Sequence, residues 1–352
     1  MFIRKQAPLL ILIVSHLTLV NQKTEIKKFI AKIPKAELHL HIEGTLEPKS
    51  MLTFAKRNHI KTKYDSIVAL KRAYHFRNLQ DFLNIYYAGA QVLKTRQDFY
   101  DLTFAYLKKA RCQNVLHTEI FFDPQIHTER GVSFENVVSG IYNALQDGQK
   151  EFHISSRLIM CFLRHLNEEA ALLTLKQALG YKDWITAVGL DSSELDHPPS
   201  KFERVFERAR ANGFITVAHA GEEGPARYIW EALKILKVSR IDHGNCALDD
   251  EKLVQELVKQ KIPLTICPLS NLKLQVVKNL SQHPLKIMLK KGLLVTINSD
   301  DPAYFGGYIN ANYEAISGAL NLSQEEIRIL AWNSFAASFL DAEQKKYYQN
   351  NR

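Results

Sequence analysis

Eight short apolar segments, separated by stretches of helical periodicity, constrain the fold of this 352-residue chain more than any other feature. Each segment is rich in Val, Ile, Leu or Thr, which is typical of strands buried in a parallel sheet. The stretches between them, such as 200–213 and 249–261, repeat apolar residues at helical spacing and carry charged outer faces. Eight strands alternating with helices predict an α/β fold of the (β/α)8 or TIM-barrel type. The predicted strands are 36–41, 115–122, 155–163, 185–193, 214–222, 239–244, 262–270 and 293–302.

A doubly wound open sheet is the main alternative, but no GxGxxG sequence follows the first predicted strand. Residues 31–345 are therefore predicted to form a single barrel domain, preceded by an extension over residues 1–30. A long helical insertion, about 46–113, separates the first two strands. Its dense aromatic residues suit a lid over the barrel mouth, and they suit an outer helical layer with an aromatic core equally well. They are Tyr74, Phe76, Phe82, Tyr86 and Tyr87.

The net charge of +9 is concentrated at the amino terminus. Residues 1–35 hold seven Lys or Arg against Glu25 alone, a net +6, so the remaining chain carries about +3. No basic stripe interleaved with aromatic residues follows, which argues against nucleic acid as a partner. The expected partner is a small molecule, and the sequence does not indicate an oligomeric state.

The amino terminus also resembles a signal peptide in part. Arg4 and Lys5 precede an apolar run over residues 7–20, but no convincing small-x-small cleavage site follows it. The run is too short for a comfortable membrane span, so we expect no stable membrane association. We expect a cytoplasmic protein, with secretion as the alternative.

Residues capable of chemistry gather at the carboxyl ends of the predicted strands. Active sites of (β/α)8 barrels form at that face, from the ends of several different strands. It is unlikely that so many predicted strands end in reactive residues by chance. The residues are His39, His41, Glu119, Asp123, Asp191, Glu194, His219, Glu222, Asp242, His243, Asp300 and Asp301.

The pair His39 and His41 indicates a metal site. Side chains two apart on a strand share a face, so the two imidazoles project together while Leu38, Leu40 and Ile42 face the helices. A structural zinc site would favour thiolates, yet the four cysteines are scattered, without a CxxC pair. A nitrogen-rich site with a carboxylate is typical of catalytic zinc. Further ligand candidates are His219, His243 and Asp300.

Four motifs, in this order and at these distances, resemble the adenosine/adenine deaminase family of metal-dependent hydrolases, within the amidohydrolase superfamily. They are HLHIEG (39–44), HAGEEG (219–224), DHG (242–244) and NSDDP (298–302). The resemblance covers residues from about 33 to 340. It implies one Zn²⁺ per subunit, held by His39, His41, His219 and Asp300.

The resemblance also implies the roles of the remaining site residues. Glu222 corresponds to the proton donor to the purine ring, and His243 to the residue that orients the metal-bound water. Asp301 and the backbone N–H of Gly189 are implied to bind the purine. Glu43 stands where nucleoside-acting relatives typically have an aspartate, so its longer side chain is expected to limit substrate size.

Within the family, the segments 120–134, 190–206, 220–233 and 298–308 are most similar to the adenine deaminase subgroup. The implied reaction is hydrolytic deamination of adenine to hypoxanthine and ammonia, in purine salvage. The alternative is an adenosine or N6-substituted adenine nucleoside or nucleotide deaminase. The role of Glu194 and His197 stays open, because they either close the pocket or shape a turn. Asp242 is expected to support its neighbour His243.

Overall fold

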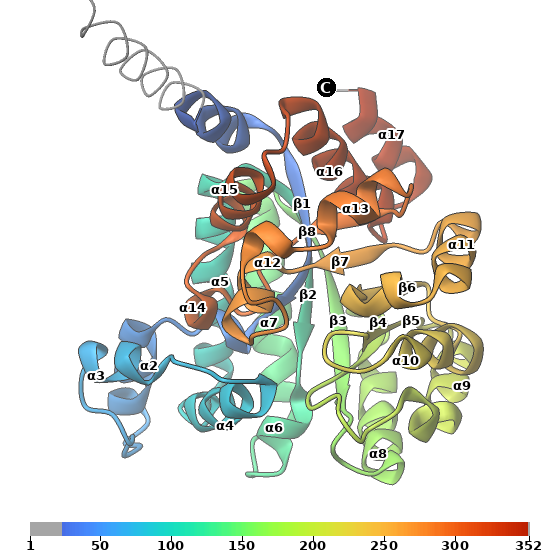
Figure 1. Ribbon diagram of the computed structural model, residues 1–352. Helices are drawn as coiled ribbons and strands as arrows, with labels where there is room; N and C mark the ends of the chain where they lie inside the picture. Colours follow the sequence, from blue (N-terminus) through green and yellow to red (C-terminus); the bar gives the residue numbers. More distant parts are fainter. Residues whose placement is uncertain (1–22, 351–352) are drawn as a thin grey trace, which may run out of the picture.

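The computed structural model describes residues 23–350, and it contains an eight-stranded sheet in which each strand pairs in parallel with the next along the chain. This is the predicted (β/α)8 barrel, with helices around the strands (Figure 1). The strands are β1 Lys35–His41, β2 Val115–Phe122, β3 Ser155–Leu163, β4 Ile185–Asp191, β5 Ile215–Ala220, β6 Arg240–His243, β7 Leu264–Ile266 and β8 Val295–Ile297.

The last strands are shorter than predicted, because both runs leave the sheet before a proline. Pro268 follows β7 and Pro302 follows β8, and each begins a short helix. The barrel closes through Asp300, which lies just beyond β8. Its N–H donates to the carbonyl of His39 at 3.1 Å, and its carbonyl accepts from the N–H of His41 at 3.1 Å. Closure therefore brings Asp300 beside the two histidines of β1.

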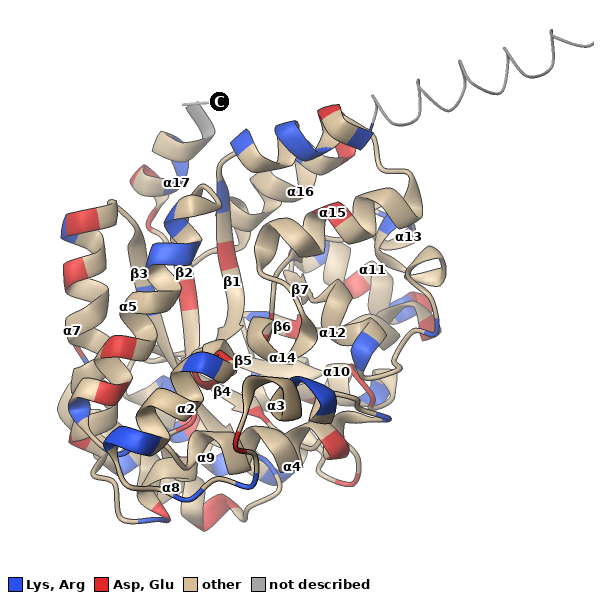
Figure 2. Cartoon of the chain, turned by 90° about the vertical axis from the view of Figure 1, so that its left-hand side faces the viewer, with Lys and Arg blue, Asp and Glu red and all other residues tan. Residues whose placement is uncertain are grey.

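The outer layer consists of helices whose charged residues of both signs are interspersed over the face seen in Figure 2. The longest helices, α5 and α7, pack side by side over β2 and β3 (Figure 1). The outer helices are α5 Arg96–Cys112, α7 Phe134–Phe152, α8 Glu168–Ala178, α9 Glu203–Ala211, α10 Ala226–Glu231, α11 Glu251–Gln260, α13 Leu285–Lys290, α15 Ile309–Leu320, α16 Gln324–Ala337 and α17 Ala342–Asn350. Short helices that follow strand ends are α6 Pro124–Thr128, α12 Pro268–Lys273 and α14 Pro302–Phe305.

The predicted insertion after β1 is helical, and one of its helices covers the barrel mouth. It comprises α2 Pro48–Arg57, α3 Ile67–Ala73 and α4 Leu79–Ala90, ahead of the outer helix α5. Phe82, Tyr86 and Tyr87 of α4 line the pocket at the mouth, as a lid would. Tyr74 and Phe76 instead pack against Tyr304 and Phe305, in an aromatic cluster behind the lid. Both interpretations of the aromatic residues therefore hold.

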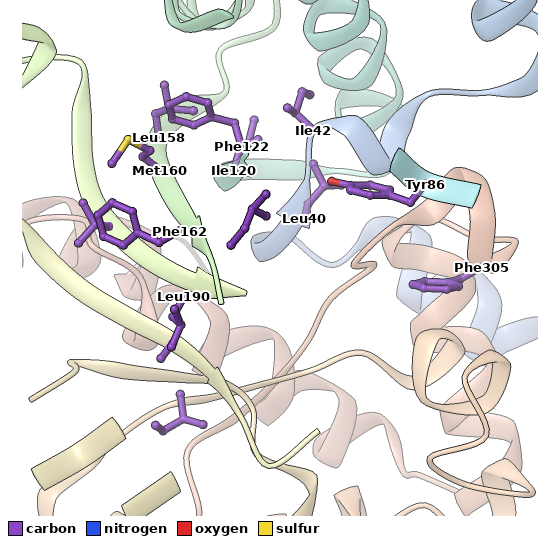
Figure 3. Close-up of a cluster of buried hydrophobic side chains, with 14 of the residues drawn as sticks. Leu40, Ile42, Tyr86, Ile120, Phe122, Leu158, Met160, Phe162, Leu190 and Phe305 are labelled. Carbon is purple, nitrogen blue, oxygen red and sulfur yellow. The ribbon is translucent and has the colours of Figure 1, made fainter. Parts of the chain in front are cut away.

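The apolar residues that alternate with the histidines of β1 are buried outside the barrel interior, as expected. Leu38 packs with Phe335 of α16, and Leu40 and Ile42 join the main core. Figure 3 shows Leu40 and Ile42 within one cluster of buried apolar side chains that includes Ile120 and Phe122. The pleat of the strand thus sends the histidines to the interior.

Residues 23–32 form a helix against the barrel, so part of the predicted extension packs on the domain. Ile30 is fully buried, and Lys27 forms an ion pair with Glu314 of α15 at 3.2 Å. The apolar run 7–20 lies outside the described residues. Among residues 23–350, no helix combines the length and the apolar character that crossing a membrane requires.

Candidate active site

A buried pocket lies at the carboxyl ends of the strands, beneath α4. The space between its walls, counted together with its opening to solvent, is about 380 Å³. Six strand ends supply its polar wall, and α4 with Phe305 supplies much of the apolar wall. The polar lining residues are His41, Asp123, Asp191, Ser192, His219, Glu222, His243, Asp300 and Asp301.

Three imidazole nitrogens and one carboxylate oxygen converge at the base of this pocket. The Nε2 atom of His219 lies 3.1 Å from Nε2 of His39 and 3.1 Å from Nε2 of His41. Asp300 Oδ1 lies 3.3 Å from Nε2 of His39 and 3.5 Å from Nε2 of His41. These are the four residues that the resemblance implies as metal ligands, and the fold brings them together.

The other ring nitrogens of these histidines fix which nitrogen carries the proton. His219 Nδ1 faces the carbonyl oxygen of Leu190 at 3.1 Å, which can only accept. His39 Nδ1 lies 2.8 Å from Thr265 Oγ1, and the Thr265 hydroxyl donates to Asp242 at 2.9 Å. Both histidines therefore carry the proton on Nδ1 and direct Nε2 lone pairs at one another.

Facing lone pairs at this separation repel unless a cation lies between them. Nitrogen ligands about 2.0–2.1 Å from a zinc ion at tetrahedral angles lie about 3.3 Å apart, which matches the observed separations. Three imidazoles and a carboxylate, without a thiolate among them, suit a catalytic zinc site. The residues present thus fit the metal that the resemblance implies.

Glu222 and His243 lie beside the ligand cluster without being part of its four donors. His243 Nε2 is 3.5 Å from Glu222 Oε2 and 3.8 Å from Asp300 Oδ2. His243 Nδ1 and Glu222 Oε1 are buried and have no hydrogen-bond partner among the described residues. Burial, and then the charge of Asp300, raises the pKa of Glu222 well above its ordinary value. A protonated Glu222 can donate to a bound base.

Two of the site residues are held in left-handed backbone conformations. The φ angles of His243 and Asp300 are 67° and 63°. Such angles are uncommon for residues other than glycine and cluster at functional sites. They turn the side chains from the strand ends into the pocket.

Asp301 enters the pocket over Gly44, which follows the histidine pair. A Cβ atom at Gly44 would lie only 2.0 Å from Asp301 Oδ1. Asp301 Oδ1 is buried and has no hydrogen-bond partner in the described part of the chain, so it is available to a ligand. The glycine of the HLHIEG motif is therefore required by the aspartate of the NSDDP motif.

Glu194 organises the loop that carries Glu222, which resolves the open interpretation of this residue. Its carboxylate accepts four backbone N–H groups at 2.6–2.9 Å. The donors are Gly221, Glu222, Glu223 and Gly224. A carboxylate that accepts so many N–H groups holds the loop rigidly. His197 takes no part in these bonds.

Two predicted substrate contacts are not supported by the structure. Gly189 lies inside β4, where an added Cβ would meet Cys161 Sγ at 2.6 Å, below the pocket and not in its wall. Glu43 is also absent from the wall, because its carboxylate turns away to His127, with Oε1 2.7 Å from Nε2. Neither residue lines the pocket wall, so both contacts stay predictions.

Asp242 supports a different histidine from the one expected. It accepts from Thr265 and from Arg240 Nε at 3.1 Å, and so acts on His39 rather than on His243. The distance from His39 Nδ1 to Asp242 Oδ1 is 3.9 Å. The sequence could not reveal this connection, because Thr265 comes from another strand.

A second acidic group, which the sequence analysis left without a role, lines the pocket. Asp123 and Asp191 lie within hydrogen-bonding reach of each other, and burial raises the pKa of both, that of Asp123 to about 7. Tyr86 donates to Asp123 Oδ2 at 3.2 Å, and Asp191 Oδ2 is 3.6 Å from His41 Nδ1. The sequence indicated a role for Asp123 and Asp191 only through their positions at the ends of predicted strands.

Comparisons with known proteins agree with this geometry. The family model described as adenosine deaminase matches residues 34–351. The chain is 60% identical over 319 residues to a protein named adenine deaminase from Acinetobacter baylyi, covering 91% of this chain and 96% of that one. It is 59% identical over 320 residues to an adenine deaminase from Wolinella succinogenes, covering 91% and 97%.

Solved structures give the same result. A crystal structure of adenine deaminase from Arthrobacter aurescens matches with a TM-score of 0.89 and 49% identity, over 90% of this chain and 97% of that chain. A Burkholderia amidohydrolase structure described with bound Zn matches with a TM-score of 0.85 and 25% identity, over 92% and 90%. The family match, the relatives and the shared fold lead to one conclusion: the chain belongs to the adenosine deaminase family.

Proposed function

We propose that this protein catalyses the hydrolytic deamination of adenine to hypoxanthine and ammonia, with one Zn²⁺ held by His39, His41, His219 and Asp300. The observation that carries the proposal is the convergence of three Nε2 atoms and a carboxylate beside the buried Glu222, whose Oε1 has no hydrogen-bond partner among the described residues. The names of relatives that are about 60% identical support adenine as the substrate.

The metal would supply Lewis acidity, lowering the pKa of a bound water toward about 7. The chain's own residues would do the rest. His243, with its unpartnered Nδ1 and its Nε2 near Asp300, is placed to orient the attacking water and take its proton. Glu222, kept protonated by burial, would donate to N1 as water adds to C6. The amino group then takes the proton that His243 holds, the C6–N bond breaks and ammonia leaves, while the hydroxyl at C6 returns a proton to Glu222 to give hypoxanthine.

Asp301 would hold the purine by its N7 edge. Its unpartnered oxygen faces the pocket over Gly44. Burial, and then Asp300, raises the pKa of Asp301 well above its ordinary value, so its carboxyl can donate to a ring nitrogen. The lid residues Tyr86 and Tyr87 would exclude bulk water from the reacting base.

The four cysteines are all free. Free thiols support a reducing compartment, so we place this purine-salvage reaction in the cytoplasm.

The test is turnover of purified protein with adenine, adenosine and an N6-methylated adenine nucleotide, followed by ultraviolet absorbance and ammonia release. We expect a clear preference for adenine, loss of activity with a chelator, and recovery on addition of Zn²⁺. A preference for the nucleoside or the nucleotide would overturn adenine as the substrate. Full activity in metal-free protein would overturn the metal assignment.

A further inference from the structure

Three polar residues of the pocket wall have no role in the reaction proposed above. Glu222, His243, Asp300 and Asp301 serve the N1, C6 and N7 side of the purine. The lining residues that remain are Asp123, Asp191 and Ser192, from the ends of β2 and β4.

One of these three, Ser192, is fully engaged, and Asp191 is engaged in part. The Ser192 hydroxyl lies 2.7 Å from Tyr87 Oη and 2.8 Å from His165 Nδ1, so it joins α4 to the barrel. Asp191 lies beside His41, with its Oδ2 atom 3.6 Å from Nδ1, where it can hold the orientation of that ring. Ser192 therefore needs no ligand to complete its contacts, whereas Asp191 Oδ1 is buried and has no hydrogen-bond partner among the described residues.

Asp123 and Asp191 each have one oxygen without a donor among the described residues, and Asp123 differs because its other oxygen is held by the lid residue Tyr86. Oδ2 accepts from the Tyr86 hydroxyl, whereas Oδ1 is buried and has no hydrogen-bond partner among the described residues. The residue is only 2% exposed, so bulk water does not satisfy that oxygen freely. The Asp191 carboxyl lies within hydrogen-bonding reach, and burial raises the pKa of both groups, so the two acids can share one proton while the pair keeps a negative charge. A buried acceptor of this kind is costly unless a ligand brings a donor.

Free adenine brings such a donor on the edge that points away from the reaction. Within the ring, N3 lies opposite C6, and N9 is bonded to the carbon next to N3. When C6, N1 and N7 are engaged as proposed, the N3/N9 edge faces the remaining wall. N9–H exists only in the free base, because in a nucleoside N9 carries the sugar.

We propose that Asp123 is a specificity-determining residue that accepts the N9–H of the free base and thereby selects adenine over N9-substituted adenines. The inference rests on the proposed deaminase function and adds the group that recognises the base. Sites built to bond a donor discriminate strongly against analogues that lack it, because the buried acceptor is then left unpaired.

Glu43 acts on this contact as a positioning residue. Arg130 Nη2 donates to His127 Nδ1 at 2.7 Å, so His127 carries its proton on Nε2 and donates it to Glu43 Oε1 at 2.7 Å. The same Glu43 oxygen lies 3.4 Å from the backbone nitrogen of Asp123. Arg130 in turn donates to the carbonyls of Ala90 and Gln91 at the end of α4. The chain of contacts ties Asp123 to the lid.

The test compares adenine with 9-methyladenine in the wild type and in Asp123→Asn, with zinc loaded. Asparagine keeps the shape of the side chain and an acceptor for Tyr86 but removes the charge. We expect kcat/KM for adenine to fall roughly 10- to 100-fold, mostly through KM, as loss of a charged hydrogen bond predicts. Turnover of 9-methyladenine, or its competitive inhibition constant where turnover is too slow, should change little.

The matched control is Asp147→Asn. Asp147 likewise accepts from a tyrosine hydroxyl, that of Tyr100 at 3.0 Å, but lies outside the pocket. It should behave as the wild type. Glu43→Gln provides a second variant if Asp123→Asn folds poorly, and it should raise KM for adenine while leaving 9-methyladenine unchanged.

The outcomes separate the two proposals. A wild type that does not deaminate adenine defeats the proposed function itself. A wild type that does, with Asp123→Asn weakening adenine and 9-methyladenine equally, defeats the N9–H contact. Two metal ions per chain in the wild type and one in Asp123→Asn would also overturn it, because His41, Asp123 and Asp191 would then hold a metal.

Discussion

At the scale of single residues, the histidines of the site divide by the partners of their Nδ1 atoms. Nδ1 of His39 faces Thr265 and Nδ1 of His219 faces a carbonyl, so each of these rings carries its proton on Nδ1. Nδ1 of His243 has no partner among residues 23–350. A ring that is not fixed in this way can take up and release a proton, which suits His243 for proton transfer and the other two for metal binding.

Glu222→Gln should separate metal binding from turnover. The amide keeps the size of the side chain but cannot donate an acidic proton to N1, so kcat should fall by roughly 10²- to 10⁴-fold. Zinc content should stay at the wild-type value, because Glu222 is not among the four converging donors. His219→Ala is the contrast and should lose zinc and activity together. Retained turnover in Glu222→Gln would exclude this residue as the proton donor.

Thr265→Val should weaken metal binding without touching a ligand directly. Valine has the same shape but cannot accept from His39 Nδ1, which then loses its orientation and its link to Asp242. Loss of such a partner typically costs about 10- to 100-fold in metal affinity. Competition with a zinc-binding dye measures this directly. An affinity equal to that of the wild type would show that the contact does not position the ring.

At the scale of secondary structure elements, the sequence predicts the features that depend on residues close together along the chain. The histidine pair of β1, the eight strands and most of the reactive residues at strand ends depend on a spacing of two residues or on the order of segments, and the structure confirms them. Glu119 is the exception, because it lies within β2, pairs with Arg240 and does not line the pocket. The contact of the Gly189 backbone with the purine stays a prediction, because a residue's depth along a strand depends on the barrel register, which no local pattern encodes. The roles of Glu194 and Asp242 depend on contacts between strands far apart in the sequence.

Glu194→Gln should loosen the loop from Gly221 to Gly224. Three backbone N–H groups converge on Oε2. In glutamine an amide NH2 group in that place is itself a donor, so it cannot accept these three hydrogen bonds. We expect a loss of about 2–4 kcal/mol in the free energy of unfolding and a lower kcat, with zinc retained. Denaturant unfolding and metal analysis check both. Unchanged stability would show that the loop holds its shape without the carboxylate.

At the scale of the whole molecule, the two ends of the barrel have separate tasks. The carboxyl ends of the strands hold the metal ligands and the pocket, whereas the first residue of β1 lies at the opposite end. That residue is Lys35, whose Nζ is fully buried and donates to the carbonyls of Ile30 and Ile33 at 2.7 Å each. In (β/α)8 barrels this end contributes to stability and the other to chemistry.

Lys35 should make the protein more stable as the pH rises above neutrality. Burial lowers its pKa in the folded state to about 7, against the opposing charge of Glu37, while the unfolded chain keeps the ordinary value near 10.5. Between these two values the unfolded state binds more protons, so the free energy of unfolding should increase with pH, by at most about 1.4 kcal/mol per unit. The increase should be complete near pH 10.5 and absent below pH 7. Urea unfolding across pH 7–10 measures it, with Lys35→Met as the reference. Equal slopes in the two proteins would show that Lys35 remains charged in the fold, held by its two carbonyl partners.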